Sequence, residues 1–247
     1  MCSVLLLSHG LPDSALAVYF IRDEYFDRAG GSPQALNPEA TAFAPLEPKQ
    51  GGSWFGFSLS GFVAGLVNRQ SDPTPSAACS RGHLIREVLL QANLQDGILR
   101  LNELLRQNVY GGCRLFVGDT TGIWYFDLPA GSRQANAEIV AKGKTQILRH
   151  LAPVQDAAPL FQPRAEEDGA AWGTRMNQVV AAHQPEHNPL CVHDQNRGSL
   201  NTALIRIGSQ GQIQQAAFGQ GAPCRGSLEA FDWLQASQPN AGLDGRL

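Results

Sequence analysis

The sequence predicts an α+β fold, in which antiparallel strands form sheets and helices cover the faces of those sheets. Apolar runs occur in pairs that are separated by short stretches of turn residues, as in hairpins. Apolar stripes at helical spacing are grouped in the middle and near the end of the chain. This order argues against a doubly wound parallel sheet, in which helices alternate with strands.

The first predicted hairpin joins two apolar runs, residues 4–8 and residues 16–21. Gly, Pro and Asp residues between the runs supply turn chemistry. A turn centred on Pro12 pairs position i with position 24 − i. This register places Cys2 opposite Arg22, where facing Cβ atoms are only about 5 Å apart.

A second hairpin follows a Gly/Pro/Asn-rich stretch that we interpret as a long loop. Residues 53–59 and 62–68 flank a Ser-Gly pair at positions 60–61. A two-residue turn at this pair places Ser53 opposite Asn68.

The remaining strands and helices follow from the same patterns. Residues 138–148 are ambiguous and suit an edge strand, and the other predicted strands are residues 114–117, 123–128, 190–193, 202–207 and 212–218. The helical stripes predict four helices. The first covers residues 80–92, and the second is capped by Asp96 and carries Leu101 to Leu105. The third covers residues 172–183, and a short fourth helix covers residues 228–234.

Composition restricts the class of protein. The net charge is −3, from 19 basic and 22 acidic residues, which argues against a nucleic-acid partner. No apolar run approaches the ~18 residues of a membrane span. The apolar start of the chain lacks the basic residues and the cleavage site of a secretory signal. We therefore expect a cytoplasmic protein without a transmembrane segment.

The five cysteines and six histidines form no recognisable metal motif. The cysteines are too scattered for a disulfide scaffold, and no CxxC pair is present, so neither a structural zinc site nor a cofactor is expected. His183 and His187 are four residues apart, but Pro185 between them breaks the helix that would align them. The thiols should stay reduced in the cytosol.

Cys2 is the one cysteine whose position suggests chemistry. Removal of Met1 before a small residue would leave a cysteine with both a thiol and a free α-amine, and the amine can act as base for its own thiol. A neighbouring Arg22 would favour the thiolate. The alternative is that Cys2 is an ordinary small residue at the head of a buried strand, and that Arg22 and Asp23 form a solvated strand end.

Several short motifs occur in a characteristic order, and together they resemble the NRDE family, also called the Transport and Golgi organisation family. The resemblance covers most of the chain and is strongest over the first third. The matching pieces are Met1-Cys2, Arg22-Asp23-Glu24-Tyr25-Phe26 with Arg28, Gly51-Gly52-Ser53-Trp54-Phe55-Gly56, Asn68, Ser80-Arg81-Gly82, Tyr110-Gly111 and Asn201-Thr202.

This resemblance implies a four-layer αββα sandwich similar to that of N-terminal-nucleophile hydrolases, built as a single domain over residues 1–237 with a frayed tail at 238–247. It implies that Cys2 is the nucleophile and that Arg22 and Asp23 orient it. Asn68 or Asn201 would donate to the oxyanion, although each could also be a strand-end residue that bonds its own backbone. Arg22, Arg28 and Arg81 could form a local basic rim.

The chain departs from the family pattern at several positions, which leave the nucleophile end of the expected site intact but alter its second half. They are Ile21, Ala29, Val67, Cys113-Arg114, and Ser199 where an arginine is usual.

Two functions from different classes follow. The first is a cysteine hydrolase or acyltransferase of the N-terminal-nucleophile type, with a small non-peptide amide or acyl compound as substrate. The second is a non-catalytic trafficking or binding protein that takes part in haem or lipid homeostasis, with haem as cargo and not as a cofactor.

Overall fold

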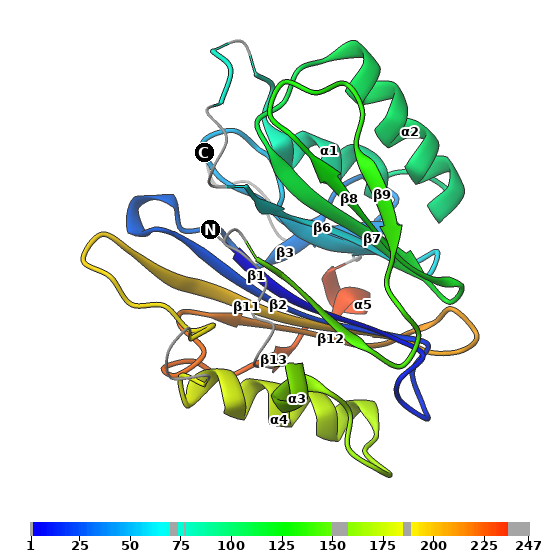
Figure 1. Ribbon diagram of the computed structural model, residues 1–247, viewed down its shortest axis with the longest axis vertical. Coiled ribbons are helices and arrows are strands. Elements are labelled where there is room, and N and C mark those ends of the chain that lie inside the picture. Colours follow the sequence, from blue (N-terminus) through cyan, green and yellow to red (C-terminus); the bar gives the residue numbers. More distant parts are fainter. Residues whose placement is uncertain (1, 70–73, 77, 150–157, 185–188, 237–247) are drawn as a thin grey trace, which may run out of the picture.

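The computed structural model describes residues 2–69, 74–76, 78–149, 158–184 and 189–236. Within these residues two antiparallel sheets lie face to face, and helices cover their outer faces (Figure 1). The first sheet contains, in spatial order, β10 (Thr145–Arg149), β1 (Cys2–Ser8), β2 (Leu16–Tyr25), β11 (Arg197–Ile207), β12 (Ile213–Gln220) and β13 (Glu229–Ala230). The second contains β3 (Pro33–Ala35), β4 (Ala42–Pro45), β5 (Phe55–Ser58), β6 (Phe62–Asn68), β7 (Cys113–Asp119), β8 (Gly122–Leu128) and β9 (Asn136–Ile139).

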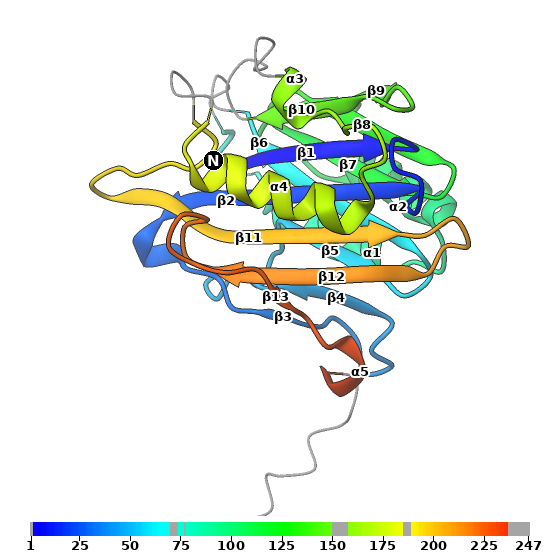
Figure 2. The same cartoon turned by 90° about the horizontal axis from the view of Figure 1, so that it is seen from below.

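The helices complete the two outer layers. α1 (Arg81–Leu89) and α2 (Leu94–Gln107) pack on the second sheet. α3 (Ala158–Phe161) and α4 (Gly169–Ala181) pack on the first sheet, and α4 runs across it in Figure 2. The predicted α+β class and the αββα layering are therefore confirmed. No helix among the described residues is long and apolar enough to cross a membrane.

Strand alternation places Cys2 in the space between the sheets. Val4 and Leu6 of β1 point into the core between the two sheets, whereas Leu5 and Leu7 point toward α4. Each of these side chains is almost fully buried, and burial of one such side chain contributes about 1.5–3 kcal/mol. Cys2 belongs to the same core as Val4 and Leu6, because it also has an even position on the strand.

The first hairpin has the predicted register, and the second does not. Cys2 pairs with Arg22, as the turn centred on Pro12 requires. In the second hairpin Phe55 pairs with Gly65, so the predicted register is wrong by one residue. The reason is the turn: three residues, not two, connect β5 to β6, and the last of them, Gly61, has φ +84°. Asn68 instead pairs with Cys113 of β7.

The helix cap and one strand prediction also differ from the structure. Asn93, not Asp96, is the N-cap of α2: its side chain accepts a hydrogen bond from the Asp96 N–H and donates one to the Asp96 carboxylate. The ambiguous stretch 138–148 is two strands, β9 and β10, at the edges of different sheets. The chain turns between them at Gly143, whose φ is +72°.

Near the C-terminus tertiary contacts override local pattern. Residues 190–193 form no named strand, only an isolated bridge between His193 and Gly198. Residues 228–234 are not one helix, because Glu229 and Ala230 pair with the edge of β12 as β13 before α5 (Trp233–Ala236) begins. The tail predicted from residue 238 lies outside the described residues.

Candidate active site

Cys2, Arg22 and Asn201 lie in one row across three neighbouring strands. Cys2 pairs with Arg22 between β1 and β2, and Arg22 pairs with Asn201 between β2 and β11. The Nη1 of Arg22 donates a hydrogen bond to Asn201 Oδ1 over 3.4 Å. All three residues are buried, so the row sits inside the protein and not on its surface.

The row lies beside a cavity of about 260 Å³ at one end of the two sheets. Cys2 and Arg22 line it from the first sheet, and Asn68 lines it from the end of β6 in the second. The remaining walls come from the segment before β5 and from the start of α1. The cavity is therefore built where the start of β1 meets the ends of β2 and β6.

The Gly-Gly-Ser-Trp and Ser-Arg-Gly motifs form one wall by packing directly on each other. The Ser53 N–H donates to the carbonyl of Gly82 over 3.1 Å. A Cβ on Gly82 would lie 2.8 Å from the Gly52 Cα, which is too close for two carbon atoms. Arg86 donates to the Gly51 carbonyl over 2.7 Å and secures the same loop. Glycine is needed here because two backbone segments meet without room for side chains.

Arg22 is held from several sides. Its guanidinium carbon lies 3.9 Å from the centre of the Trp54 ring, and its Nη2 donates to the Arg28 carbonyl over 2.8 Å. The Trp54 ring in turn packs against Gly30, where a Cβ would be only 2.1 Å from the ring. Burial lowers the pKa of Arg22, although an arginine stays charged at any ordinary pH. The cavity thus contains a fixed positive charge beside Cys2.

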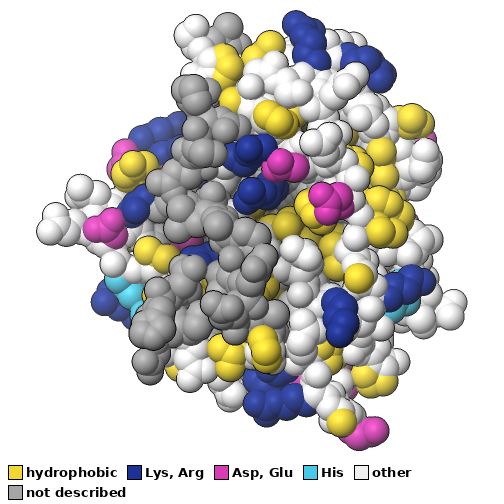
Figure 3. Space-filling model, in the orientation of Figure 1, with side chains coloured by type: hydrophobic (Ala, Val, Ile, Leu, Met, Phe, Trp, Pro, Cys, Tyr) yellow, Lys and Arg dark blue, Asp and Glu magenta, His cyan; other side chains and the backbone are white. Residues whose placement is uncertain are grey.

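The lining of the cavity is strongly charged. The expected basic rim is present, because Arg22, Arg28 and Arg81 all line the cavity, and Glu24 and Glu47 line it as well. Arg28 forms ion pairs with Glu24 at 3.4 Å and with Glu47 at 3.7 Å. Arg81 donates to the backbone carbonyl of Gly112 over 3.1 Å. On the face seen in Figure 3, basic side chains lie at several separate places with acidic ones between them.

Asp23 lies on the other face of β2 from Arg22. It is buried with Tyr19 and Ile21 on its side of the strand, and its Oδ1 accepts a hydrogen bond from Ser199 Oγ over 2.6 Å. Burial raises the pKa of Asp23 to about 6, whereas the Ser199 hydrogen bond and the charge of Arg149 act in the opposite direction. Ser199, one of the departures from the family pattern, therefore has a defined role as the partner of Asp23.

The Cys2 thiol is influenced by both of its predicted partners. Burial raises the pKa of the Cys2 thiol. The positive charge of Arg22 and a hydrogen bond from the Asp23 backbone N–H both act to lower it. Asp23 thus reaches the sulfur through its backbone, while its carboxylate points to the opposite face of the strand.

The structure brings some of the predicted site residues together and separates others. Cys2, Arg22 and Asn68 share the cavity, and Asn201 reaches it through Arg22. Sequence reasoning missed the part that Trp54 plays in holding Arg22, although the motif that contains it was noticed. It also missed Glu47, which has no local signal because it lies in a loop.

Residues that can bind a metal gather elsewhere in the described part of the chain. His183, Cys191, His193 and Cys224 place their ligand atoms within 4.8 Å of one another. They looked scattered in the sequence because they come from three separate segments, and no spacing rule joins such segments.

Solved structures of other proteins share this architecture. An N-acylethanolamine-hydrolyzing acid amidase ortholog from Caenorhabditis elegans aligns with a TM-score of 0.57 and 11% identity, over 89% of this chain and 100% of its own. Penicillin V acylase from Agrobacterium tumefaciens aligns with a TM-score of 0.52 and 11% identity, over 89% of this chain and 83% of its own. At this identity the likeness concerns the fold alone, which resembles that of N-terminal-nucleophile hydrolases, as the motifs implied.

A comparison of the sequence with models of protein families identifies the family. A family model described as Transport and Golgi organisation 2 matches residues 1–149. The chain belongs to this family, as its motifs predicted. No curated protein matches the chain in sequence.

Proposed function

We propose that the protein is a cysteine hydrolase or acyltransferase of the N-terminal-nucleophile type that acts on a small non-peptide amide or acyl compound. The observation that carries the proposal is the position of Cys2, at the head of β1, opposite Arg22 and lining a cavity. Both structural neighbours, an amidase and an acylase by name, share the fold of this chain. The family resemblance independently implies that Cys2 is the nucleophile. The charged lining favours a polar substrate.

Removal of Met1 would free the α-amine of Cys2. That amine takes the proton of its own thiol, and the sulfur attacks the carbonyl carbon of the substrate. The leaving group departs with the proton from the amine and leaves a thioester on Cys2. Water, or an acceptor hydroxyl or amine, then gives a proton to the α-amine, attacks the thioester and releases the thiol.

The surrounding residues support these steps in different ways. Arg22 stabilises negative charge on the sulfur and is held in place by Trp54. Asn68 lines the cavity and is our candidate donor to the oxyanion. Asn201 accepts from Arg22 and acts by positioning it.

The experiment is intact-mass analysis of the purified protein, followed by incubation with a panel of short N-acyl amides and thioesters. We expect loss of the Met1 mass, product release, and an acyl adduct that maps to Cys2 and not to Cys79, the other thiol that lines the cavity. The Cys2→Ala variant should be inactive. Retention of Met1, or product release that Cys2→Ala leaves unchanged, would contradict the proposal.

A non-catalytic binding role is the second candidate, and the buried thiol favours it, because burial raises the pKa of Cys2 and so favours the unreactive thiol. In that case haem or lipid would be cargo. Titration of the protein with haem would then shift the Soret band stoichiometrically, and Cys2→Ala would bind equally well while no substrate of the panel is turned over.

A further inference from the structure

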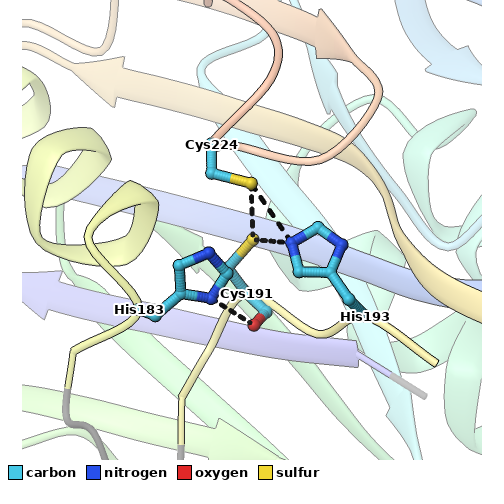
Figure 4. A group of neighbouring side chains, drawn as sticks. All are labelled: His183, Cys191, His193 and Cys224. Carbon is cyan, nitrogen blue, oxygen red and sulfur yellow. Dashed lines mark hydrogen bonds between the residues drawn. The ribbon is translucent and has the colours of Figure 1, made fainter.

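We propose that His183, Cys191, His193 and Cys224 bind one Zn²⁺ ion in a tetrahedral site with two sulfur and two nitrogen ligands. The site is separate from the cavity that Cys2 lines, and the proposal is independent of the proposed hydrolase activity. Figure 4 shows the four side chains converging from the end of α4, from the segment after it and from the loop after β12.

The distances between three of the ligand atoms are close to those of a zinc site. The two sulfur atoms of Cys191 and Cys224 are 3.7 Å apart. His193 Nε2 lies 3.5 Å from the sulfur of Cys191 and 3.1 Å from that of Cys224. A tetrahedron with Zn–S of about 2.3 Å and Zn–N of about 2.0–2.1 Å requires S···S separations of about 3.8 Å and S···N separations of about 3.6 Å. Three of the ligand atoms are thus already close to the required spacing.

His183 is the fourth ligand, and its backbone is held in an unusual conformation. It follows α4 with φ 57°, in the left-handed region where a helix usually ends with glycine. Its ring lies 5.1 Å from the ring of His193, measured between centroids. Its Nδ1 lies 3.3 Å from the Cys191 carbonyl oxygen. In the tautomer with hydrogen on Nδ1, this nitrogen donates to the carbonyl and Nε2 is available for the metal.

The chemistry of the donors selects the metal. Two thiolates and two imidazoles are a common ligand set of structural zinc, and four protein ligands leave no open position for a substrate. Binding converts both thiols to thiolates and releases their two protons to solvent. We therefore assign the ion a structural role.

A disulfide between Cys191 and Cys224 is the competing explanation of the two close sulfur atoms. Their separation of 3.7 Å is far from the bond length of about 2.05 Å, and both cysteines are free. A disulfide would also give no reason for two imidazoles to gather beside the sulfurs. A metal ion accounts for all four side chains.

The ion would join the three segments and support the strand that carries Arg22. The backbone N–H of Val192, between two of the ligands, donates to Ser199 Oγ over 2.9 Å. Ser199 in turn donates to Asp23 over 2.6 Å. A fixed position for residues 191–193 therefore fixes Ser199, which donates to Asp23.

The test is metal analysis of the full-length protein, expressed with added zinc and purified under reducing conditions without chelator. We expect one zinc per chain in the wild type and in the control variants Cys79→Ser and His9→Ala, whose exposed side chains lie outside the cluster. Cys224→Ser and His193→Ala should lose most of the metal. His193 is exposed and Cys224 is half-buried, and Ser is close in size to Cys, so the variants should fold.

A second measurement uses the wild-type protein, so it does not depend on whether a variant folds. After zinc is removed by a chelator, Co²⁺ added to the wild type should produce the intense visible absorption of tetrahedral cobalt with thiolate ligands. The thermal midpoint should fall on chelation in the wild type and change little in Cys224→Ser. Wild-type protein without zinc, equal zinc in Cys224→Ser, or a Cys191–Cys224 disulfide in the reduced preparation would overturn the proposal.

Discussion

The guanidinium carbon of Arg22 lies 3.9 Å from the centre of the Trp54 ring, so an arginine of one sheet is clamped by an aromatic ring that precedes a strand of the other. A desolvated contact of this kind contributes about 2 kcal/mol. It also fixes the plane of the guanidinium group, which directs one nitrogen to Asn201 and another to the Arg28 carbonyl. The position of the positive charge beside Cys2 therefore depends on packing between the sheets.

Arg22→Lys should slow acylation of Cys2 by about 10- to 30-fold, because lysine keeps the charge but cannot stack flat on Trp54 or donate in two fixed directions. The measurement is the rate of adduct formation by mass spectrometry, with the thermal midpoint recorded in parallel. An unchanged rate in a folded Arg22→Lys variant would show that the orientation of the guanidinium group is unimportant.

Asn68 and Asn201 should respond differently to replacement. Asn68→Ala should lower kcat by about 10²–10³, the usual cost of removing one oxyanion donor. Asn201→Ala should have a smaller effect, because Asn201 acts on Arg22 and does not line the cavity. The two are compared by steady-state kinetics on the best substrate of the panel. The reverse order of effects would assign the oxyanion donor to Asn201.

Gly82→Ala should destabilise the protein by about 1–3 kcal/mol, because the new Cβ would lie 2.8 Å from two backbone atoms of the Gly52–Ser53 segment. Gly31→Ala is the matched control: nothing lies within 4 Å of its Cβ, and we expect a change within about 0.5 kcal/mol. Urea unfolding at neutral pH measures both. Similar stabilities for the two variants would contradict the close packing of the wall.

Stability should depend on the ionisation of Asp23. Its pKa is about 6 in the folded protein and about 3.9 when unfolded, so the folded state holds the proton more tightly. The stabilisation from this proton is complete below about pH 4 and is lost as the pH rises through 6. Asp23→Asn has no such proton. Its free energy of unfolding should therefore improve relative to the wild type between pH 4 and pH 7, by an amount on the order of 2 kcal/mol.

Denaturant unfolding of both proteins across this pH range measures the difference. Ser199→Ala supplies an internal check, because the Ser199 hydrogen bond lowers the pKa of Asp23. In the Ser199→Ala variant, which lacks this hydrogen bond, the loss of stability with rising pH should therefore occur at a higher pH than in the wild type. A difference between Asp23→Asn and the wild type that is constant with pH would show that folding does not shift the pKa of Asp23.

Local patterns predicted much of the fold. The hairpin from Cys2 to Arg22 was predictable because a turn centred on Pro12 pairs position i with position 24 − i, and the structure has this register. The second hairpin was wrong by one residue, because two-residue and three-residue turns with glycine look alike in sequence. Residues 228–234 were misassigned because pairing with the edge of β12 outweighs a weak helical pattern.

The sequence by itself determined the antiparallel α+β class and the family, because each depends on neighbours along the chain. The turn centred on Pro12 also predicted the pairing of Cys2 with Arg22, which the structure confirms. Only the tertiary structure decided that Trp54 holds Arg22, that Asp23 faces away from the cavity with Ser199, and that two cysteines and two histidines meet. These relationships join residues far apart in the chain. The distances between these residues are set by how the sheets and helices pack, and spacing along the sequence does not predict that packing.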